Sequence, residues 1–484
     1  MEIIMNYSII IYILGYVLRF EGIFMLLPSG IAVIYHEKSG FAYLLVGVIC
    51  FLLGTAVTLR KPQNTVFYAR EGFVTVALSW LVMSIFGCLP FILNGGIPNF
   101  TDALFETISG FTTTGASILS NVEGLSHCNL FWRSFTHWIG GMGVFVFILT
   151  VLPLAGGHNM HLLRAESPGP DVGKLVPRMR DTAKILYGIY IVMTIMEILL
   201  LLLAQMPLFD AITTSFGTAG TGGFGIKNDS IAGYSIAIQN IVTIFMILFG
   251  VNFNAYYALL GKRKGSVFKM EELRWYFGII LVAIIIITVS TTQFYHSYGA
   301  AFQGAAFQVA SIITTTGFAT VDFNLWPQLS KCILILIMMI GACAGSTGGG
   351  IKVSRVVILL KTVKKELGIY IHPRSVKRIT MDGKALTDRT VHGVCIFLVT
   401  YVLIYIISVF LIAFDNHDFV TNFTAVAATI NNIGPGLELV GPTQNFSIFS
   451  GFSKYILMFD MLAGRLELYP LLLLFTPSVW RRRS

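Results

Sequence analysis

The chain has 484 residues, of which 55% are hydrophobic and only 12% are charged, and its mean hydropathy is +0.77. Soluble proteins carry about 25% charged residues, so this chain has too few charged side chains to cover a water-soluble surface. The composition therefore excludes a soluble enzyme or a secreted domain, and the high hydrophobicity excludes a disordered chain. The meaning of the net charge of +9 depends on where the charges lie.

Ten apolar stretches are long enough to cross a membrane as helices, which requires about 20 mostly apolar residues. They are residues 7–34, 41–59, 72–93, 131–154, 185–205, 237–260, 275–292, 329–360, 391–413 and 452–475. The eighth is too long for one regular helix and contains a glycine-rich stretch. Four shorter apolar stretches end in glycine-rich turns, near residues 101–118, 207–224, 300–318 and 419–436. Their length is typical of re-entrant half-helices, which enter a membrane and leave on the same side.

Most basic residues lie on one side of this ten-span arrangement. Of the 33 Lys and Arg residues, 26 lie in segments 60–71, 155–184, 261–274, 352–390 and 481–483. The positive-inside rule then places these segments and both termini in the cytoplasm, and the half-helices enter from outside. Topology alone accounts for the basic loops, and binding of anionic lipids is the alternative. Arg133 and Lys454 lie near span ends, where we expect them to reach the membrane surface.

The four short stretches end in related sequences, which indicates an internal repeat. Residues 111–116 read FTTTGA, residues 218–223 read TAGTGG, residues 313–318 read ITTTGF, and residues 430–435 read INNIGP. An alignment on glycine makes Gly115, Gly222, Gly317 and Gly434 equivalent. A span precedes each half-helix and another span follows each turn, so the last eight spans form four copies of one hairpin.

The expected fold is an all-α polytopic membrane protein with four pseudo-repeated span–half-helix–filter–span hairpins around one pore. Two extra N-terminal spans precede the hairpins. The units are 1–70 (the extra spans), 71–160, 161–268, 269–365 (with the glycine-rich stretch) and 366–484.

The four turns have the composition of a cation filter. The C-terminal end of a helix carries a partial negative charge, and rings of backbone carbonyls can replace the hydration shell of a potassium ion. None of the four windows contains a carboxylate, which favours a monovalent cation over a divalent one. The predicted ion-binding residues are Thr112, Thr113, Thr114, Gly115, Gly220, Thr221, Gly222, Gly223, Thr314, Thr315, Thr316, Gly317, Asn431, Asn432, Ile433 and Gly434.

The glycine-rich stretch Gly341–Gly350 interrupts the eighth span. Glycine costs about 1 kcal/mol per position in a helix relative to alanine, so we expect the stretch to unwind into a loop just below the third turn. The alternative is close helix packing through small residues. Arg465 is the lone cation inside the tenth span, and carbonyls of this loop are its expected acceptors.

The motifs together resemble those of the Trk/Ktr family of bacterial potassium uptake proteins, in its Trk-type membrane-subunit (TrkH-like) branch. The resemblance covers essentially the whole chain. It rests on the stretches Thr112–Ser117, Ser215–Phe224, Thr314–Phe318, Asn431–Gly436, Gly345–Lys352, Gly464–Pro470 and Arg164–Pro170, with Lys174, Pro177 and Arg178. The two extra spans also match the Trk branch.

The resemblance implies potassium uptake through the cell (inner) membrane and no enzymatic activity. It implies a homodimer with one pore per protomer, a cytoplasmic nucleotide-binding regulatory subunit (TrkA-like), and potassium as substrate, without a cofactor in this chain. It also assigns gating to the glycine-rich segment and to the arginine beside it. The gate residues are then Gly345, Ser346, Thr347, Gly348, Gly349, Gly350, Lys352 and Arg465.

Two windows depart from the T-T-T-G pattern. The second has Gly220 where two others have threonine, and the fourth has Asn431, Asn432 and Ile433. The filter is therefore not fourfold symmetric, and weaker discrimination against sodium is expected. A sodium-coupled potassium symporter, or a weakly selective sodium/potassium pathway, is the alternative function. A membrane-embedded enzyme would need a cluster of ionisable groups inside the spans, and the sequence pattern contains none.

Overall fold

The structure is a computed structural model that describes residues 5–63, 68–151, 179–260, 267, 269–374 and 378–480. Helices make up nearly all of its regular structure, as predicted. One short antiparallel hairpin, β1 (Thr380–Met381) with β2 (Lys384–Ala385), is the exception to the all-α expectation. The predicted basic segment 481–483 and residues 155–178 of another lie outside the described residues.

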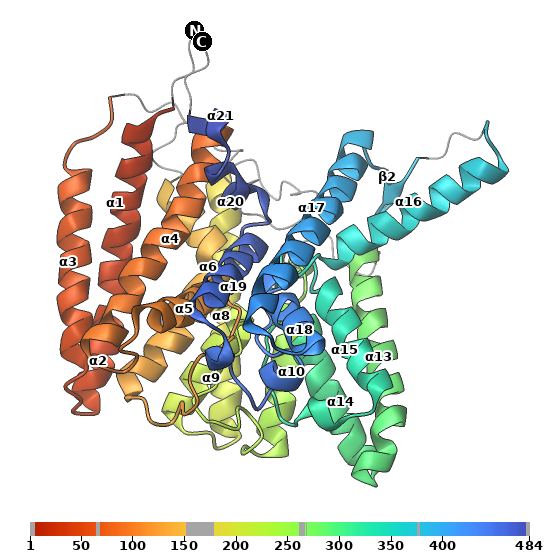
Figure 1. Ribbon diagram of the computed structural model, residues 1–484, viewed down its shortest axis with the longest axis horizontal. Coiled ribbons are helices and arrows are strands. Elements are labelled where there is room, and N and C mark those ends of the chain that lie inside the picture. The colour runs from red at the N-terminus through yellow and green to blue at the C-terminus, as the bar shows by residue number, and fades with distance from the viewer. Residues whose placement is uncertain are drawn as a thin grey trace.

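Three N-terminal helices lie at one edge of the molecule (Figure 1). They are α1 (Tyr7–Phe24), α2 (Leu26–Ile34) and α3 (Gly40–Thr58). A methyl group on Gly22 would lie 2.5 Å from the carbonyl oxygen of Gly47 and 2.9 Å from the backbone nitrogen of Phe51. Small residues allow two backbones to approach this closely, which is how helices associate where both water and a hydrophobic driving force are absent.

The order of a long helix, a short helix, an irregular segment and another helix occurs four times along the rest of the chain. These helices are α4 (Ala69–Leu93), α5 (Phe100–Phe111) and α6 (His127–Val151); α8 (Met179–Leu203), α9 (Leu208–Gly220) and α10 (Ile236–Phe249); α13 (Glu271–Tyr295), α14 (Tyr298–Ile313) and α15 (Gln328–Ile340); and α17 (Asp388–Ile412), α18 (Phe419–Ile430) and α19 (Gly451–Arg465). In Figure 1 the short helices α9 and α14 lie in the lower part of the molecule, and α5 and α18 lie near its middle height.

Side-chain caps begin three of the four short helices. Asn99, Ser297 and Asp418 each accept a hydrogen bond from a backbone N–H of the first turn of α5, α14 and α18, respectively. Such caps satisfy donors that have no partner within the helix. The helix α9 follows Pro207 instead, whose fixed φ suits a helix start.

Apart from the one-residue break at Met25 between α1 and α2, three of the ten predicted spans are interrupted. The sixth bends by 92° between α10 and α11 (Phe253–Leu260). The eighth breaks, as predicted, at residues 341–352 between α15 and α16 (Val353–Ile371), and the tenth ends at Arg465 before α20 (Tyr469–Leu474) and α21 (Pro477–Trp480). Six described helices are long and apolar enough to cross a membrane, or seven with the bent pair.

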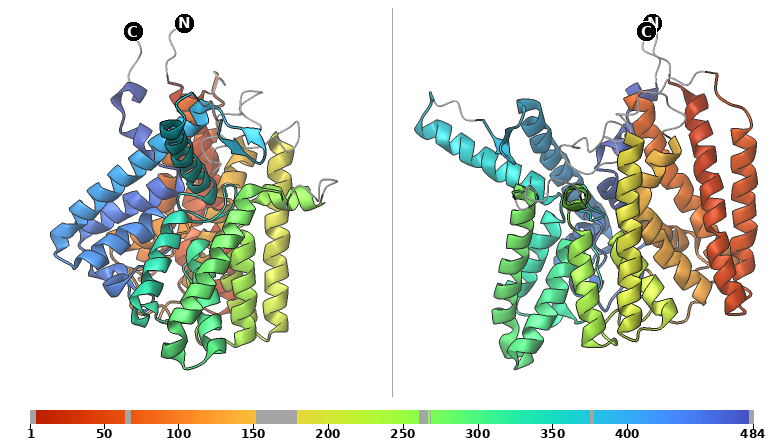
Figure 2. Two further views of the ribbon diagram at one scale, coloured as in Figure 1. Left: turned by 90° about the vertical axis from the view of Figure 1, so that its right-hand side faces the viewer. Right: turned by 180° about the vertical axis from the view of Figure 1, so that it is seen from behind.

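The first and last described helices meet at one end of the molecule. The rings of Tyr7 and Trp480 stack with their centroids 6.5 Å apart. The C-terminal part of α16 and the β hairpin lie toward the same end, whereas the loops that lead into α9 and α14 lie at the opposite end (Figures 1 and 2). Figure 2 also shows α16 projecting from the body, on the side away from α1 and α3.

Candidate functional site

The four short helices end in the same hydrogen-bonded turn. We name residues 112–115, 220–223, 314–317 and 431–434 the first to fourth turn segments. In each, one N–H donates to a carbonyl five residues earlier at 2.8–2.9 Å: Thr114 to Ser109, Gly222 to Gly217, Thr316 to Ser311, and Ile433 to Ala428. The preceding residue is left-handed, with φ of 54–58° at Thr113, Thr221, Thr315 and Asn432. This pattern is the Schellman motif that closes a helix C-terminus.

A left-handed glycine ends each turn segment. The φ angles are 77° at Gly115, 76° at Gly223, 86° at Gly317 and 98° at Gly434. The predicted alignment on Gly222 is thus wrong by one residue, because Gly223 takes the left-handed position. Two adjacent glycines occur here, and the sequence pattern does not show which of them follows the turn. In the corrected register Gly220 and Gly222 stand where the first segment has Thr112 and Thr114.

The four glycines bring the turn segments into a closed ring. A methyl group built on Gly115 would overlap the carbonyl oxygen of Gly222, and one on Gly223 would overlap that of Thr316. One on Gly317 would overlap the carbonyl oxygen of Ile433. The ring closes because a methyl group on Gly434 would lie 2.9 Å from the carbonyl oxygen of Thr114. Each segment therefore contacts the next one in chain order.

The ring contains backbone conformations that favour glycine or asparagine, yet three of the left-handed residues before the glycines are threonines. A left-handed conformation costs an L-residue roughly 1–2 kcal/mol. Such strain persists only where the surroundings impose it, and it is common at functional sites. Thr113, Thr221, Thr315 and Asn432 are fully buried.

Two of the turn segments contain a pair of threonine hydroxyls within hydrogen-bonding distance of each other. The Oγ1 atoms of Thr112 and Thr114 are 2.8 Å apart, and those of Thr314 and Thr316 are also 2.8 Å apart. Neither the second nor the fourth segment can form this pair, since they carry Gly220 and Gly222, or Asn431 and Ile433. The departures seen in the sequence thus remove one specific hydrogen bond from two of the four segments.

A cavity of about 180 Å³ lies beside the ring, toward the connecting loops. All four left-handed glycines contribute to its lining, together with polar residues such as Gln444 and Asn445. The ring therefore has an open approach at the end of the molecule from which the short helices start.

The glycine loop, residues 341–352, lies against the ring from the α15–α16 side. The N–H of Gly349 donates to Thr315 Oγ1 at 2.6 Å, and a methyl group on Gly348 would lie 2.8 Å from the carbonyl oxygen of Thr314. A methyl group on Gly349 would overlap the carbonyl oxygen of Asn431. The predicted loop below the third turn segment is therefore present, and it also touches the fourth.

Side chains from two other parts of the chain, and one from the loop itself, hold the glycine loop. Arg465 donates to the carbonyl of Thr347 at 2.8 Å, as predicted, and to that of Gly140 on α6 at 2.5 Å. Glu272 Oε1 accepts from the N–H groups of Ala344 at 2.7 Å and Ser354 at 3.1 Å. Within the loop, Lys352 donates to the carbonyl of Gly348.

The break between α10 and α11 also holds this loop. The N–H of Cys343 donates to the carbonyl of Gly250, and the N–H of Phe253 donates to that of Gly345. The bend in the sixth span thus supplies backbone partners to an unwound stretch between two apolar helices, and irregular backbone inside a membrane needs such partners.

Comparisons with known proteins agree with this arrangement. The family profile described as "TrkH: Cation transport protein" matches residues 39–482. The chain belongs to this family. It is 39% identical to the Trk system potassium uptake protein TrkH of Salmonella typhimurium and 38% identical to that of Escherichia coli K12, over 99% of this chain and 100% of each relative. It also matches the crystal structure of the potassium transporter TrkH from Vibrio parahaemolyticus, with a TM-score of 0.87, 34% identity, and coverage of 99% and 100%.

Membership of the TrkH family makes the chain a membrane transport protein rather than an enzyme. The family resemblance stated from the motifs is confirmed over nearly the whole length. The helical architecture is confirmed at the level of the fold as well.

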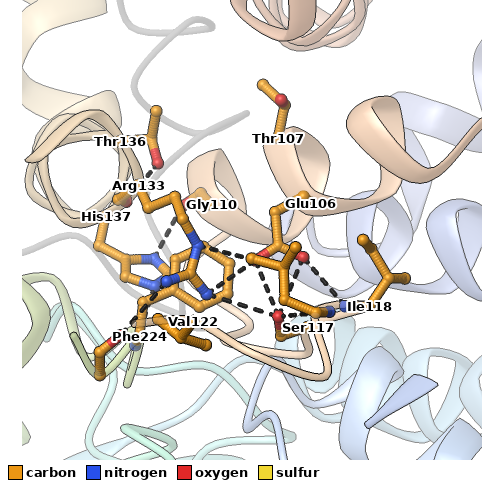
Figure 3. A network of polar contacts seen from close by, with 12 residues as sticks. Glu106, Thr107, Gly110, Ser117, Ile118, Val122, Arg133, Thr136, His137 and Phe224 are labelled. Atoms are coloured by element: carbon orange, nitrogen blue, oxygen red, sulfur yellow. Dashed lines mark hydrogen bonds and ion pairs between the residues drawn. The ribbon is translucent and has the colours of Figure 1, made fainter. Parts of the chain in front are cut away.

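A buried ion pair that the sequence analysis missed joins the first and second turn segments in this TrkH-family chain. Arg133 Nε donates to Glu106 Oε1 at 2.8 Å, and both side chains are at most 2% exposed. Glu106 also accepts from the hydroxyl of Ser117 and the N–H of Ile118, and Arg133 donates to the carbonyl of Gly225 (Figure 3). The pair therefore spans from the exit of the first segment to that of the second.

The expectation that Arg133 reaches the membrane surface is wrong, whereas for Lys454 it stays a prediction. Arg133 pairs with Glu106, and Lys454 Nζ lies 2.6 Å from Asp102 Oδ1 with its side chain only 9% exposed. Opposite charges inside apolar stretches were the available signal, because buried ions require partners. The spacing along the chain does not show which two helices come together.

Proposed function

We propose that this chain conducts potassium ions inward across the cell (inner) membrane, through a pore whose filter is the ring of four turn segments. The observation that carries the proposal is the ring itself, in which each left-handed glycine abuts the next segment's carbonyl. The printed names of the relatives, which are potassium uptake proteins, support the choice of ion. The proposed filter residues are the sixteen of the four segments, with Gly223 in register with Gly115, Gly317 and Gly434.

The chemistry of the ring suits a monovalent cation. Four helix C-termini direct their partial negative charges toward one region. Alternating left- and right-handed residues turn successive carbonyls the same way, and carbonyl rings substitute for the hydration shell of potassium. The buried hydroxyl oxygen of Thr113 has no hydrogen-bond partner among the described residues. A cation in the ring would supply one.

The same proposal assigns the domains and the orientation. Units 71–160, 161–268, 269–365 and 366–484 are the four pore hairpins, and 1–70 is the extra unit. The stacking of Tyr7 on Trp480 supports one common side for both ends of the chain, which the basic segments identify as the cytoplasm. A homodimer and a cytoplasmic nucleotide-binding regulatory subunit rest on the family resemblance.

The glycine loop is the proposed gate. It covers the inner face of the third and fourth segments. The bonds described above hold this closed position; they involve residues 345–350 and Lys352 of the loop, and Arg465 of α19. Glycine gives the backbone freedom to move between two positions. Arg465 places a positive charge below the filter, which opposes a cation at that point until the loop moves.

Removal of Gly348 and Gly349 tests the gate. We expect rubidium influx to rise severalfold, because the deletion removes the N–H that bonds Thr315 and the carbonyl that accepts from Lys352. The measurement is initial rubidium influx per folded protein in proteoliposomes. Gly393→Ala, at an exposed helical position with nothing within 4 Å of an added methyl group, is the control for expression and folding. Reduced or unaltered influx with intact folding would favour a packing role for the loop.

Growth and influx test the proposed function. Bacteria that lack potassium uptake would be given this chain together with a TrkA-type regulatory subunit and grown at micromolar potassium. We expect growth to be restored and rubidium to enter. Failure of rescue by a membrane-inserted, folded chain would contradict the proposal.

The second candidate is a sodium-coupled symporter or a weakly selective pathway. The observation that favours it is the missing threonine pair in the second and fourth segments. Rubidium influx measured with and without external sodium separates the candidates. An absolute requirement for sodium indicates coupling, whereas competition by sodium indicates weak selectivity.

A further inference from the structure

His137 on α6 lies against the second turn segment at the two positions where the first and third segments carry a threonine pair. A methyl group on Gly222 would overlap the imidazole ring of His137, and one on Gly220 would overlap the backbone carbonyl of His137. These two glycines are the residues in register with Thr112 and Thr114. The second turn segment therefore lacks side chains at the two positions where α6 lies closest.

The imidazole replaces the lost hydroxyls with two hydrogen bonds of its own. The N–H of Phe224 donates to Nε2 at 3.2 Å, so Nε2 is an acceptor. Nδ1 lies 2.9 Å from the carbonyl oxygen of Gly110 and donates to it, which defines the neutral Nδ1–H form. His137 is fully buried, and its ring lies 4.2 Å from that of Phe224, centroid to centroid (Figure 3).

These bonds connect two parts of the ring. Gly110 is in the last turn of α5, just before the first segment, and Phe224 directly follows Gly223. A neutral imidazole with both nitrogens hydrogen-bonded is a rigid spacer, because a histidine side chain has only two torsion angles and the two bonds fix both. The position of Phe224 sets that of the carbonyl of Gly223, because they share a peptide unit.

We propose that His137 is a positioning residue for the second filter segment and that it sets the preference for potassium over sodium there. This inference rests on the proposed function, since it presumes that the turn segments form the filter. His137 performs from outside the segment the task that the hydroxyl pairs perform within the first and third segments. A residue that only filled space would influence folding without changing ion preference.

A four-variant series tests the inference by the ratio of rubidium to sodium permeability in proteoliposomes. His137→Ala removes two hydrogen bonds to the filter frame, and we expect the ratio to fall about tenfold. Gly222→Ser places a side chain against the imidazole ring and is expected to lower the ratio similarly. The double variant gives the serine the vacated space, so we expect its ratio to exceed that of Gly222→Ser by about threefold or more. His137→Gln keeps one donor and one acceptor and is expected to retain most of the ratio.

The outcomes separate this inference from the proposed function. Gly317→Ala, which His137 does not touch, reports on the filter alone. Suppose that Gly317→Ala changes the permeability ratio, but that the His137 variants leave it unchanged or that the effects of His137→Ala and Gly222→Ser simply add in the double variant. Only the positioning role then fails. If none of the variants changes the ratio, the filter assignment fails as well. Size-exclusion profiles of the solubilised protein verify folding. If neither His137 variant yields folded protein, the histidine is needed for the fold as a whole and the positioning role is overturned.

Discussion

Replacement of Gly317 by alanine is expected to reduce rubidium influx by at least tenfold. Gly317 has φ of 86°, which costs an L-residue roughly 1–2 kcal/mol. Its new methyl group would also overlap the carbonyl oxygen of Ile433, which is backbone and cannot rotate away. The third and fourth segments must therefore separate, and the ring of carbonyls loses its spacing. The measurement is initial influx normalised to folded protein, with sodium permeability as a second reading.

Gly278→Ala is the matched control for this substitution. Gly278 lies on α13 of the same unit, with a helical backbone and nothing within 4 Å of an added methyl group. We expect influx through this variant to equal that of the unaltered chain. Equal influx through both variants would show that the Gly317 contact is irrelevant to conduction, which contradicts the filter proposal.

Replacement of Glu106 by glutamine is expected to cause the largest loss of stability. Removing one partner of a buried ion pair costs about 3–5 kcal/mol, because the remaining charge is left uncompensated. Arg133 would be that charge, and it is 2% exposed. The expected result is a drop of several degrees in the apparent unfolding temperature of the purified protein. The pair of Lys331 and Glu438, 3.7 Å apart with Glu438 48% exposed, provides the control through Glu438→Gln, because the removed charge is the solvent-exposed one.

A double variant, Glu106→Gln with Arg133→Gln, sharpens this prediction. The two single losses should add to more than the loss in the double variant, because each single variant leaves the other member of the pair as an unpaired buried charge, whereas the double variant leaves neither. Additive losses would mean that the two side chains act independently, despite their short separation. A smaller effect on stability than that of Glu438→Gln would contradict the importance of the buried pair.

The sequence was most informative where local chemistry decides the structure. Four T-T-T-G-like windows after short apolar stretches predicted four half-helices, because helix termination by a left-handed residue depends on a few consecutive residues. The glycine-rich stretch predicted the break of the eighth span, since glycine destabilises a helix wherever it lies. Arg465 was expected to find carbonyls of that loop, and Thr347 supplies one.

The sequence was misleading where two backbone conformations were equally compatible with the neighbouring residues. Gly222 and Gly223 both permit a left-handed backbone, and only the contact with the carbonyl of Thr316 shows that Gly223 is the left-handed one. The sixth span looked continuous because its residues are apolar throughout, yet it bends at Gly250–Asn252 against the glycine loop. Such a bend depends on partners from elsewhere in the chain.

By itself, the sequence determined that this is a helical membrane protein of the TrkH type, because hydropathy, basic loops and turn motifs each depend on residues close together in the chain. The low charge content, with no carboxylate in any turn segment, already pointed to a monovalent cation and to backbone oxygens. Only the tertiary structure decided the register of the second segment, the partners of Arg133 and the position of His137 against Gly220 and Gly222. Those features join residues from different helices, and their distances depend on how the four units close into one ring.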